Sequence, residues 1–336
     1  MLLIGIDEAG YGPLLGPLCH GYCAIRCPIP DNGEPPDLWK LLHPSVMRFP
    51  GFDGSTTVDD SKKIHCAPGG RELLARGVRA FLECLEQASP PAGDLYTTIL
   101  PSHDRAKLEE DAWCAAAPDR PPSNGNAAET GKRISKKVAA PGPPPANIPA
   151  LRDALKHSGI SVLAVGARGM SAKHYNVALE SAGNKADVNW NVIAEQFSAL
   201  VGLAQPGESV HAVIDRQGGR KFYAGRIAAL FPGAMPWTES ESPQASVYRV
   251  ESSGRVARLA FMVGADGHSL PVALGSMAAK LTRELCMHRL NAFFRGHAPE
   301  LKPTAGYYAD ANRFLHETRG LRMKLGIENA ALIRAK

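Results

Sequence analysis

Two adjacent acidic side chains, Asp7 and Glu8, follow an apolar run and precede a glycine-rich loop in "LLIGIDEAGYGPLLGP". Neighbouring carboxylates repel each other and lose solvation at the end of an apolar strand, so we expect a cation beside them. Asp215 ends "HAVID" and Asp266 ends "LAFMVGAD", and each is followed by glycine within a few residues. Strands that bring such acids to one end of a sheet would form an oxygen-rich site of the kind that Mg²⁺ binds.

Turn chemistry is a simpler interpretation of these acids, because aspartate is common where strands end. It explains any one of them alone, but a turn needs one acid, whereas Asp7 and Glu8 are two. Consecutive strand residues point to opposite faces of a sheet. We therefore expect the first strand to end or bulge at Glu8, so that both carboxylates reach one site.

The elements that position these acids follow from the hydrophobic periodicity of the chain. Strands are predicted for "LLIGID" and "HGYCAIRC" as a hairpin, for "ISVLAVGA" and "SVHAVID", and for a hairpin in "SVYRVESSGRVARLAFMVGAD". Helices are predicted for "RELLARGVRAFLECLEQ", "DVNWNVIAEQFSALVGLA" and residues 275–294, whereas "DLYTTIL" predicts a short strand and "VDDSKKIH" a loop. Strands mixed with helices in this order indicate an α/β fold.

Residues 114–149 have a different composition, with eight prolines and the basic stretch "GKRISKK". Such a segment buries too little apolar surface to offset its ordering entropy, so we expect a disordered insertion. It would divide one catalytic domain into residues 1–113 and 150–295. Residues 296–336 would then form a C-terminal helical extension that contributes to substrate binding.

The composition is that of a globular protein that is not embedded in a membrane: 336 residues, 44% hydrophobic and 21% charged, with a net charge of +5. The charge favours polyanionic partners only mildly. No run of 18 apolar residues predicts a membrane span, and the amino terminus lacks the basic region of a secretory signal. Seven cysteines without paired CxxC spacing suit a reducing compartment, so we expect a cytoplasmic protein.

Cys19, Cys23 and Cys27 recur every four residues, with His20 among them. This spacing matches no zinc or iron–sulfur ligand pattern. On a strand, even spacing puts all three thiols on one face, where cysteine behaves as a small hydrophobic residue. We therefore expect a buried strand here and no metal.

Several motifs together resemble the type 2 ribonuclease H (ribonuclease HII) family. "GIDEAGYGPLLGP" is similar to the family's opening Asp-Glu-Ala-Gly-Arg-Gly-Pro and second Gly-Pro, and "DDSKK" to its Asp-Ser-Lys-Lys motif. "GADGHSLPVALGSMAAKLTRE" resembles the metal-binding segment, with the ten-residue interval from Asp266 to Ser276 retained. "HAVID" resembles the strand of the third acid, "MSAKHYNVAL" loosely resembles the start of the helix after the third strand, and "TAGYYAD" resembles the later Gly-Tyr-Gly-Thr element.

The resemblance implies a ribonuclease H-like fold, with a mixed central sheet flanked by helices. It also implies that Asp7, Glu8, Asp215 and Asp266 are catalytic and hold two Mg²⁺ or Mn²⁺ ions. Two such ions clamp a scissile phosphate, one activating water and the other stabilising the leaving 3′-oxygen. The expected substrate is an RNA–DNA hybrid or a duplex DNA that contains ribonucleotides, cut to leave 5′-phosphate and 3′-hydroxyl ends. We expect a monomer with no membrane partner.

The resemblance also assigns substrate-binding residues. These are Gly10, Tyr11, Gly12, Ser61, Lys62, Lys63, Ser276, Lys280, Arg283 and Tyr307. Lysines at 62 and 63 suit backbone phosphates, and Lys280 and Arg283 are aimed at the site if their helix starts there. "RQGGRK" after Asp215 would cradle phosphate through its backbone amides. The alternative for all these cations is a solvated surface or a plain turn.

The chain departs from the family pattern at identifiable positions. Tyr11 stands in place of the family's arginine between the two glycines, and Tyr308 and Ala309 replace the later glycine and threonine. All four acids remain, which favours hydrolysis with an altered substrate preference. Two other functions stay open: a non-catalytic nucleic-acid-binding module on the same fold, and an ATP phosphotransferase of the actin-like or sugar-kinase type, whose phosphate loop "IGIDEAG" partly matches.

Overall fold

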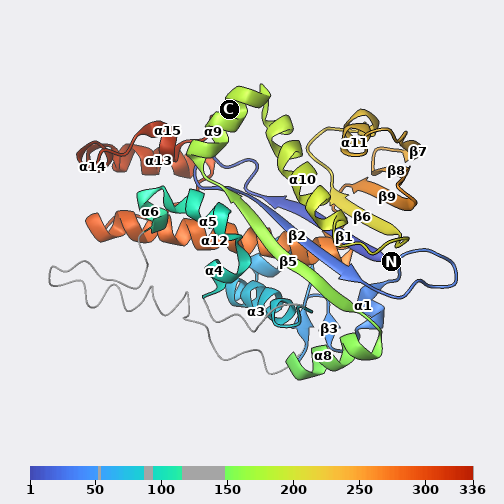
Figure 1. Ribbon diagram of the computed structural model, residues 1–336. Helices are drawn as coiled ribbons and strands as arrows, with labels where there is room; N and C mark the ends of the chain where they lie inside the picture. The colour runs from blue at the N-terminus through green and yellow to red at the C-terminus, as the bar shows by residue number, and fades with distance from the viewer. Residues whose placement is uncertain (52–53, 87–93, 116–147, 336) are drawn as a thin grey trace.

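The computed structural model describes residues 1–51, 54–86, 94–115 and 148–335 (Figure 1). Seven strands in this part of the chain form one sheet, in the order β5-β2-β1-β6-β9-β8-β7. Their bounds are Leu2–Ala9 (β1), Leu18–Arg26 (β2), Ser161–Met170 (β5), Val210–Asp215 (β6), Trp237–Glu241 (β7), Ala245–Ser252 (β8) and Arg255–Met262 (β9).

The sheet is mixed. β1 is antiparallel to β2 and parallel to β6, and β6 is parallel to β9. β8 and β9 are antiparallel and joined by a tight turn in which Ser253 and Gly254 both have positive φ, as two-residue hairpin turns require. The predicted α/β class and both predicted hairpins are confirmed.

Helices cover both faces of the sheet (Figure 1). The helices of the first half are Leu38–Leu41 (α1), Ser61–Cys66 (α2), Gly70–Leu82 (α3), Leu95–Ile99 (α4), Ser102–Glu109 (α5) and Ala112–Ala115 (α6). Those of the second half are Ile148–His157 (α8), Ala172–Ala182 (α9), Lys185–Val201 (α10), Ala224–Leu230 (α11), Leu270–His297 (α12), Tyr308–Glu317 (α13), Arg319–Lys324 (α14) and Asn329–Leu332 (α15). Val46–Met47 (β3) and Thr56–Thr57 (β4) form a separate two-stranded pair, and Ala265–Gly267 is a short 3₁₀ helix (η1).

Alternation along β1 divides its side chains between two cores. Leu2, Ile4 and Ile6 lie in the core that includes residues of α10 and α11, whereas Leu3 lies in the larger core that includes residues of α3 and α12. Apolar residues on both faces are typical of a strand buried in the middle of a sheet. β1 is therefore a central strand, and its carboxyl end is held rigidly from both sides.

Helix α12 crosses the sheet at very short range. A Cβ atom on Gly5 of β1 would lie 2.1 Å from the carbonyl carbon of Pro271, so only glycine permits this approach. Gly21 of β2 makes the same kind of contact with Gly275. The glycines fix α12 against the centre of the sheet and bring Ser276 to the end of β1.

Three predicted elements are corrected by the structure. "DLYTTIL" forms helix α4 and not a strand, because Asp94 Oδ1 accepts a hydrogen bond from Thr97 N (2.8 Å) and caps the turn. "DSKKIH" forms helix α2 and not a loop, because Asp60 Oδ1 accepts from Lys62 N (2.7 Å). Helix α12 begins at Leu270, earlier than the predicted 275, with Pro271 in its first turn, where proline is favoured.

The predicted insertion falls mostly outside the described residues, which omit 116–147. At its edges, Cys114 lies in α6 and Ile148 begins α8, and both side chains are buried. The three thiols of "CHGYCAIRC" are buried as expected, and burial raises the pKa of each. In the described ranges, no helix is both long enough and apolar enough to cross a membrane.

Candidate metal centre

The acids predicted to form the site meet at one edge of the sheet. Asp7 lies on β1, Asp215 is the last residue of β6, and Asp266 lies in η1, just after β9. These three strands are parallel neighbours, so their carboxyl ends lie side by side. One carboxylate oxygen each from Asp7, Glu8 and Asp215 lie within 4.8 Å of one another.

Glu8 joins this group without any break in the strand. β1 continues to Ala9 in regular register, with Glu8 paired to His20 of β2, so the expected end or bulge at Glu8 is wrong. Asp7 is on the same face as Leu3, facing α12, and Glu8 faces α10. The two side chains approach from opposite faces and meet beyond the end of β6.

The surroundings of Asp7, Glu8 and Asp215 disfavour the ionised form of each carboxyl group. Burial, then the charges of Asp215 and Glu8, raise the pKa of Asp7 well above its ordinary value, and Ser276 partly opposes this. Burial and Asp215 raise the pKa of Glu8 to about 7. Burial also raises the pKa of Asp215, against a hydrogen bond from Ala265 N to its Oδ1 (3.0 Å). A bound cation would reverse each of these shifts.

Asp266 extends the cluster without belonging to its inner group. In the described part of the chain, the group of three or more such residues whose ligand atoms lie within 4.8 Å of one another is Asp7, Glu8 and Asp215, without Asp266. Burial, followed by the charges of Asp60 and Asp215, raises the pKa of Asp266. Asp60 is therefore an acid beside the site that the sequence did not single out, although it stands in the "DDSKK" motif.

The donor set fits hard divalent cations. All the candidate ligand atoms are carboxylate oxygens, which Mg²⁺ and Mn²⁺ prefer. Glu8 Oε2 is buried and has no hydrogen-bond partner among the described residues. A buried carboxylate oxygen without a donor is costly, and a metal ion would supply the missing partner. Asp7, Glu8, Asp215 and Asp266 are the residues that would hold it.

Neighbouring polar residues orient these carboxylates. The Ser276 hydroxyl lowers the pKa of Asp7 and is 3.0 Å from Ser61 Oγ, and both serines are buried. Lys62 is exposed, yet its charge lowers the pKa of Glu8, Asp215 and Asp266. The structure thus brings Ser61, Lys62 and Ser276 together with the acids.

Asn189 of α10 is a site residue that sequence reasoning missed. It is fully buried, and its amide lowers the pKa of Glu8. Its Oδ1 accepts a hydrogen bond from His20 Nε2, and burial lowers the pKa of His20 to about 4. A neutral His20 therefore fixes the Asn189 amide beside Glu8. The only sequence signal was a polar residue within the apolar run "DVNWNVI".

Arg283 supports the glycine loop from behind and does not face the site. Its Nη1 donates to Pro17 O (2.9 Å), and its Nη2 donates to Leu15 O (3.2 Å) and Ala305 O (3.0 Å). The residue is only 2% exposed. In this structure its role is to support the loop, and the predicted contact with substrate is not seen. Gly10 has φ +86° and packs closely against this side chain. A Cβ atom at Gly10 would lie 2.9 Å from Arg283 Cδ, so the position favours glycine.

The C-terminal residues hold the same loop from another side. Gly306 O accepts from Leu14 N (2.8 Å), and Arg334 N donates to Leu14 O (3.0 Å). The Arg334 guanidinium also donates to Pro13 O. Tyr307 directly follows Gly306 and is 56% exposed, so it lies next to the glycine loop with its ring accessible.

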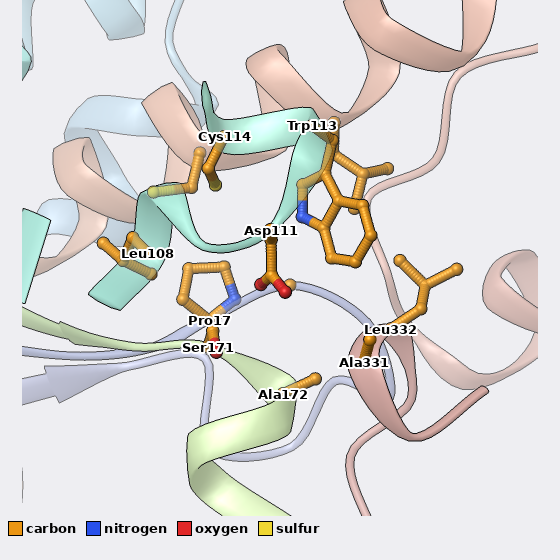
Figure 2. A pocket seen from close by; sticks show the side chains of 12 residues that line it. Pro17, Leu108, Asp111, Trp113, Cys114, Ser171, Ala172, Ala331 and Leu332 are labelled. Carbon is orange, nitrogen blue, oxygen red and sulfur yellow. The ribbon is translucent and has the colours of Figure 1, made fainter. Parts of the chain in front are cut away.

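A small cavity of about 10 Å³ lies between the glycine loop and the helices packed around it. Figure 2 shows the Asp111 carboxylate pointing into this space, between Pro17, Trp113 and Ser171, with Leu332 of α15 closing one side. Burial raises the pKa of Asp111 to about 7. The cavity is too small for a substrate, and the residues that line it support the loop.

Two further predicted cations are engaged in ion pairs. Lys280 Nζ is 3.1 Å from Glu284 Oε1, one turn along α12, and Lys63 Nζ is 3.8 Å from Asp59 Oδ1. In this structure Lys280 pairs with Glu284, and its contact with substrate stays a prediction. Gly12 is exposed with open space where a Cβ would be, and Tyr11 is half-buried.

Comparisons with known proteins found likenesses at the level of structure alone. No protein-family model matches the chain, and no curated protein matches it. The chain is similar to the ribonuclease HII of Archaeoglobus fulgidus, solved in complex with PCNA, at 14% identity and a TM-score of 0.39, over 100% of this chain and 95% of that one. It is also similar to the ribonuclease H2 of Pyrococcus horikoshii, at 14% identity and a TM-score of 0.40, over 99% and 92% of the two chains.

Proposed function

We propose that this protein is a divalent-metal-dependent endoribonuclease that cleaves the RNA strand of RNA–DNA hybrids. The observation that carries the proposal is the approach of Asp7, Glu8 and Asp215 to within 4.8 Å at one edge of the sheet. Three carboxylates this close, with Asp7 buried and Glu8 and Asp215 partly buried at the ends of adjacent strands, repel one another unless cations are bound. The resemblance of the opening motif to ribonuclease HII gives the substrate class.

The four acids would hold two Mg²⁺ or Mn²⁺ ions, with Asp266 as a further ligand beside the group of Asp7, Glu8 and Asp215. Bound ions of this kind lower the pKa of water and neutralise charge on the scissile phosphate, which allows hydrolysis to 5′-phosphate and 3′-hydroxyl ends. The Ser276 hydroxyl and the Asn189 amide lie beside Asp7 and Glu8 and lower the pKa of these carboxyl groups. The exposed Lys62 supplies a positive charge for a backbone phosphate beside the acids.

The glycine loop would read the ribose. Gly12 is exposed and leaves open space above its backbone, so a sugar 2′-hydroxyl can come within hydrogen-bond distance of main-chain groups there. Arg283 and Arg334 hold the loop carbonyls, which keeps this surface rigid. The loop follows Glu8 directly, so the recognised ribose lies next to the cut.

The test is cleavage of four labelled duplexes: an RNA–DNA hybrid, a DNA duplex with one ribonucleotide, double-stranded RNA and double-stranded DNA. Hybrids are nicked with Mg²⁺ or Mn²⁺ and not with EDTA. Asp7→Asn lowers the rate by roughly a thousandfold or more and leaves hybrid binding largely intact. The matched control is Asp153→Asn, which changes an exposed acid on α8 and keeps the wild-type rate.

The same assay separates the alternatives. A protein that binds hybrids but cuts none of them, with either metal, is a binding module and not an enzyme. ATP binding by calorimetry, together with inactivity on all four duplexes, would identify the phosphotransferase. Wild-type cleavage by Asp7→Asn would show that the acid cluster is not the active site.

A further inference from the structure

A second cavity lies beside the acid cluster. Its volume is about 460 Å³, within the roughly 300–1,000 Å³ range of ligand pockets. Its walls come from the loops that follow the two acid-bearing strands and from α10: Tyr11, three residues after Glu8, residues 217–222, which begin two residues after Asp215, and Ala186. A group bound here would therefore be close to whatever occupies the acid cluster.

Gln217 lines this cavity as a buried polar group without a partner. The residue is 3% exposed, and neither its Oε1 nor its Nε2 has a hydrogen-bond partner among the described residues. Leaving both ends of an amide unpaired and buried costs free energy. A side-chain amide presents one donor and one acceptor side by side, which matches the adjacent donor and acceptor on the edge of a nucleobase.

The rest of the lining combines aromatic rings with positive charge. Phe222 is 70% exposed, an unusual exposure for a phenylalanine, and Tyr11 is half-buried. Arg220 and Lys221 supply two cations, and no acid lines the cavity. Arg220 Nη2 is held by Asp187 Oδ1 (3.0 Å), while its buried Nη1 has no partner in the described structure. The cavity thus suits a flat aromatic group joined to an anion.

We propose that this cavity binds one unpaired nucleotide of the nucleic-acid strand, with its base against Phe222 and the Gln217 amide and its phosphate beside Arg220. Stacking on aromatic side chains and a cationic groove are the usual means of holding unpaired bases. The proposal rests on the proposed function only in taking the ligand to be a nucleic acid. It gives a purpose to Tyr11, where the chain departs from the ribonuclease HII pattern, and to "RQGGRKFY", which directly follows Asp215.

The test measures binding without cleavage, with full-length Asp7→Asn protein and fluorescence anisotropy. The probes are a fully paired RNA–DNA hybrid, the same hybrid with one bulged adenosine moved stepwise along the RNA strand, and a matched series with an abasic bulge. The abasic series keeps the bend and the phosphate and removes only the base. At one or more positions, the adenosine bulge binds at least about fivefold tighter than the abasic bulge.

Variants then assign the contacts. Phe222→Ala reduces the adenosine-to-abasic ratio to near one, whereas Trp237→Ala, at a 73% exposed residue outside the lining, leaves it unchanged. Gln217→Leu removes the differences between bulged A, C, G and U. Arg220→Ala weakens both bulge series, and Arg226→Ala is its control, because Arg226 also pairs with Asp187 but does not line the cavity.

Equal binding of adenosine and abasic bulges at every position would overturn the proposal, as would a Phe222→Ala variant that keeps the wild-type ratio. The proposal would also be overturned if excess AMP displaced the bulged hybrid equally well from wild type and from Phe222→Ala. Free nucleotides would then bind somewhere other than this cavity. Cleavage is measured separately, with the wild-type protein, which retains Asp7. A chain that prefers base-bearing bulges but never cuts hybrids retains this cavity site and loses the ribonuclease assignment.

Discussion

Gly21 of β2 and Gly275 of α12 touch backbone to backbone: a Cβ atom on Gly21 would lie 1.8 Å from the carbonyl oxygen of Gly275. No side chain separates the helix from the sheet at this point. The contact sets the height of α12 above β1 and β2. It therefore sets where Ser276, the next residue of the helix, meets Asp7.

The first prediction follows from that contact. Gly21→Ala is expected to lower the free energy of unfolding by about 3 kcal/mol or more, because backbone atoms on both sides must move to admit the methyl group. Gly296→Ala in α12 is the control, since nothing lies within 4 Å of a Cβ there. It is expected to be neutral or stabilising by up to about 1 kcal/mol. Chemical denaturation of both variants checks this, and equal stabilities would refute it.

The second prediction concerns the acid cluster without metal. Because the folded pKa of Asp7 is raised above its unfolded value, its contribution to stability is present at low pH and is lost as pH rises through the folded pKa. Asp7→Asn is therefore expected to unfold at a higher temperature than wild type at pH 8 in EDTA. Adding Mg²⁺ raises the wild-type melting temperature more than that of the variant, which differential scanning fluorimetry measures. A metal response identical in both proteins would argue against metal binding at Asp7.

The third prediction uses Asp111, far from the acid cluster in the sequence and buried in the small cavity behind the loop (Figure 2). Its pKa is raised from 3.8 to about 7, so its stabilising contribution is complete below pH 4 and is lost between about pH 4 and 7. Asp111→Asn, which keeps a polar partner for Ser171, is expected to be more stable than wild type by about 2 kcal/mol at pH 8 and not at pH 4. Chemical denaturation of wild type and variant at pH 4 and pH 8 measures this difference. An equal gain in the free energy of unfolding at both pH values would contradict a raised pKa of Asp111.

The fourth prediction tests the support of the glycine loop. Arg283→Lys weakens the hydrogen bonds to the carbonyl groups of Leu15, Pro17 and Ala305, because an ammonium group lacks the planar fork of guanidinium. Hydrogen exchange of Leu14 and Leu15 is expected to speed up by at least about tenfold, as their local opening becomes easier. Arg319→Lys, at an exposed position of α14, changes neither rate. Unchanged protection in Arg283→Lys would show that the C-terminal contacts alone hold the loop.

The fifth prediction concerns Tyr11, whose ring lies 5.2 Å from Lys185 Nζ and lines the larger cavity. Tyrosine cannot grip a phosphate as an arginine fork does, so we expect weaker cleavage at a single embedded ribonucleotide than within longer RNA tracts. Tyr11→Arg is expected to shift the ratio of kcat/KM toward the single-ribonucleotide duplex. An unaltered ratio would mean that Tyr11 does not set this preference and that the glycines alone read the ribose.

The edge of the sheet that carries the acids was predictable because its information is local. Each of Asp7, Asp215 and Asp266 follows an apolar strand pattern, and parallel strands bring their carboxyl ends together. The regular course of β1 through Glu8 was not predictable, because alternation alone cannot show how far the neighbouring strand extends. Here β6 ends at Asp215, one pair beyond Ile6, and leaves room for both side chains.

The errors came from contacts between distant segments. Arg283 has the spacing of a surface cation on α12, and nothing within the helix shows that residues 15, 17 and 305 surround it with carbonyl groups. Asn189 was missed for the same reason, since its partners His20 and Glu8 belong to the first hairpin. The short segment 94–100 was assigned to a strand because so brief an apolar run has no clear period, and its capping aspartate was the better signal.

The strand order has a consequence for the time at which the acids first meet. β1 and β2 can pair as soon as they are made, but Asp215 and Asp266 reach the ribosome exit much later. At translation rates of roughly 5–20 residues per second, the last acid follows the first by about ten to fifty seconds. The edge of β1 stays open until β6 has emerged, and the set of four acids is complete only once residue 266 has followed. The acid cluster therefore assembles only after most of the chain has left the ribosome.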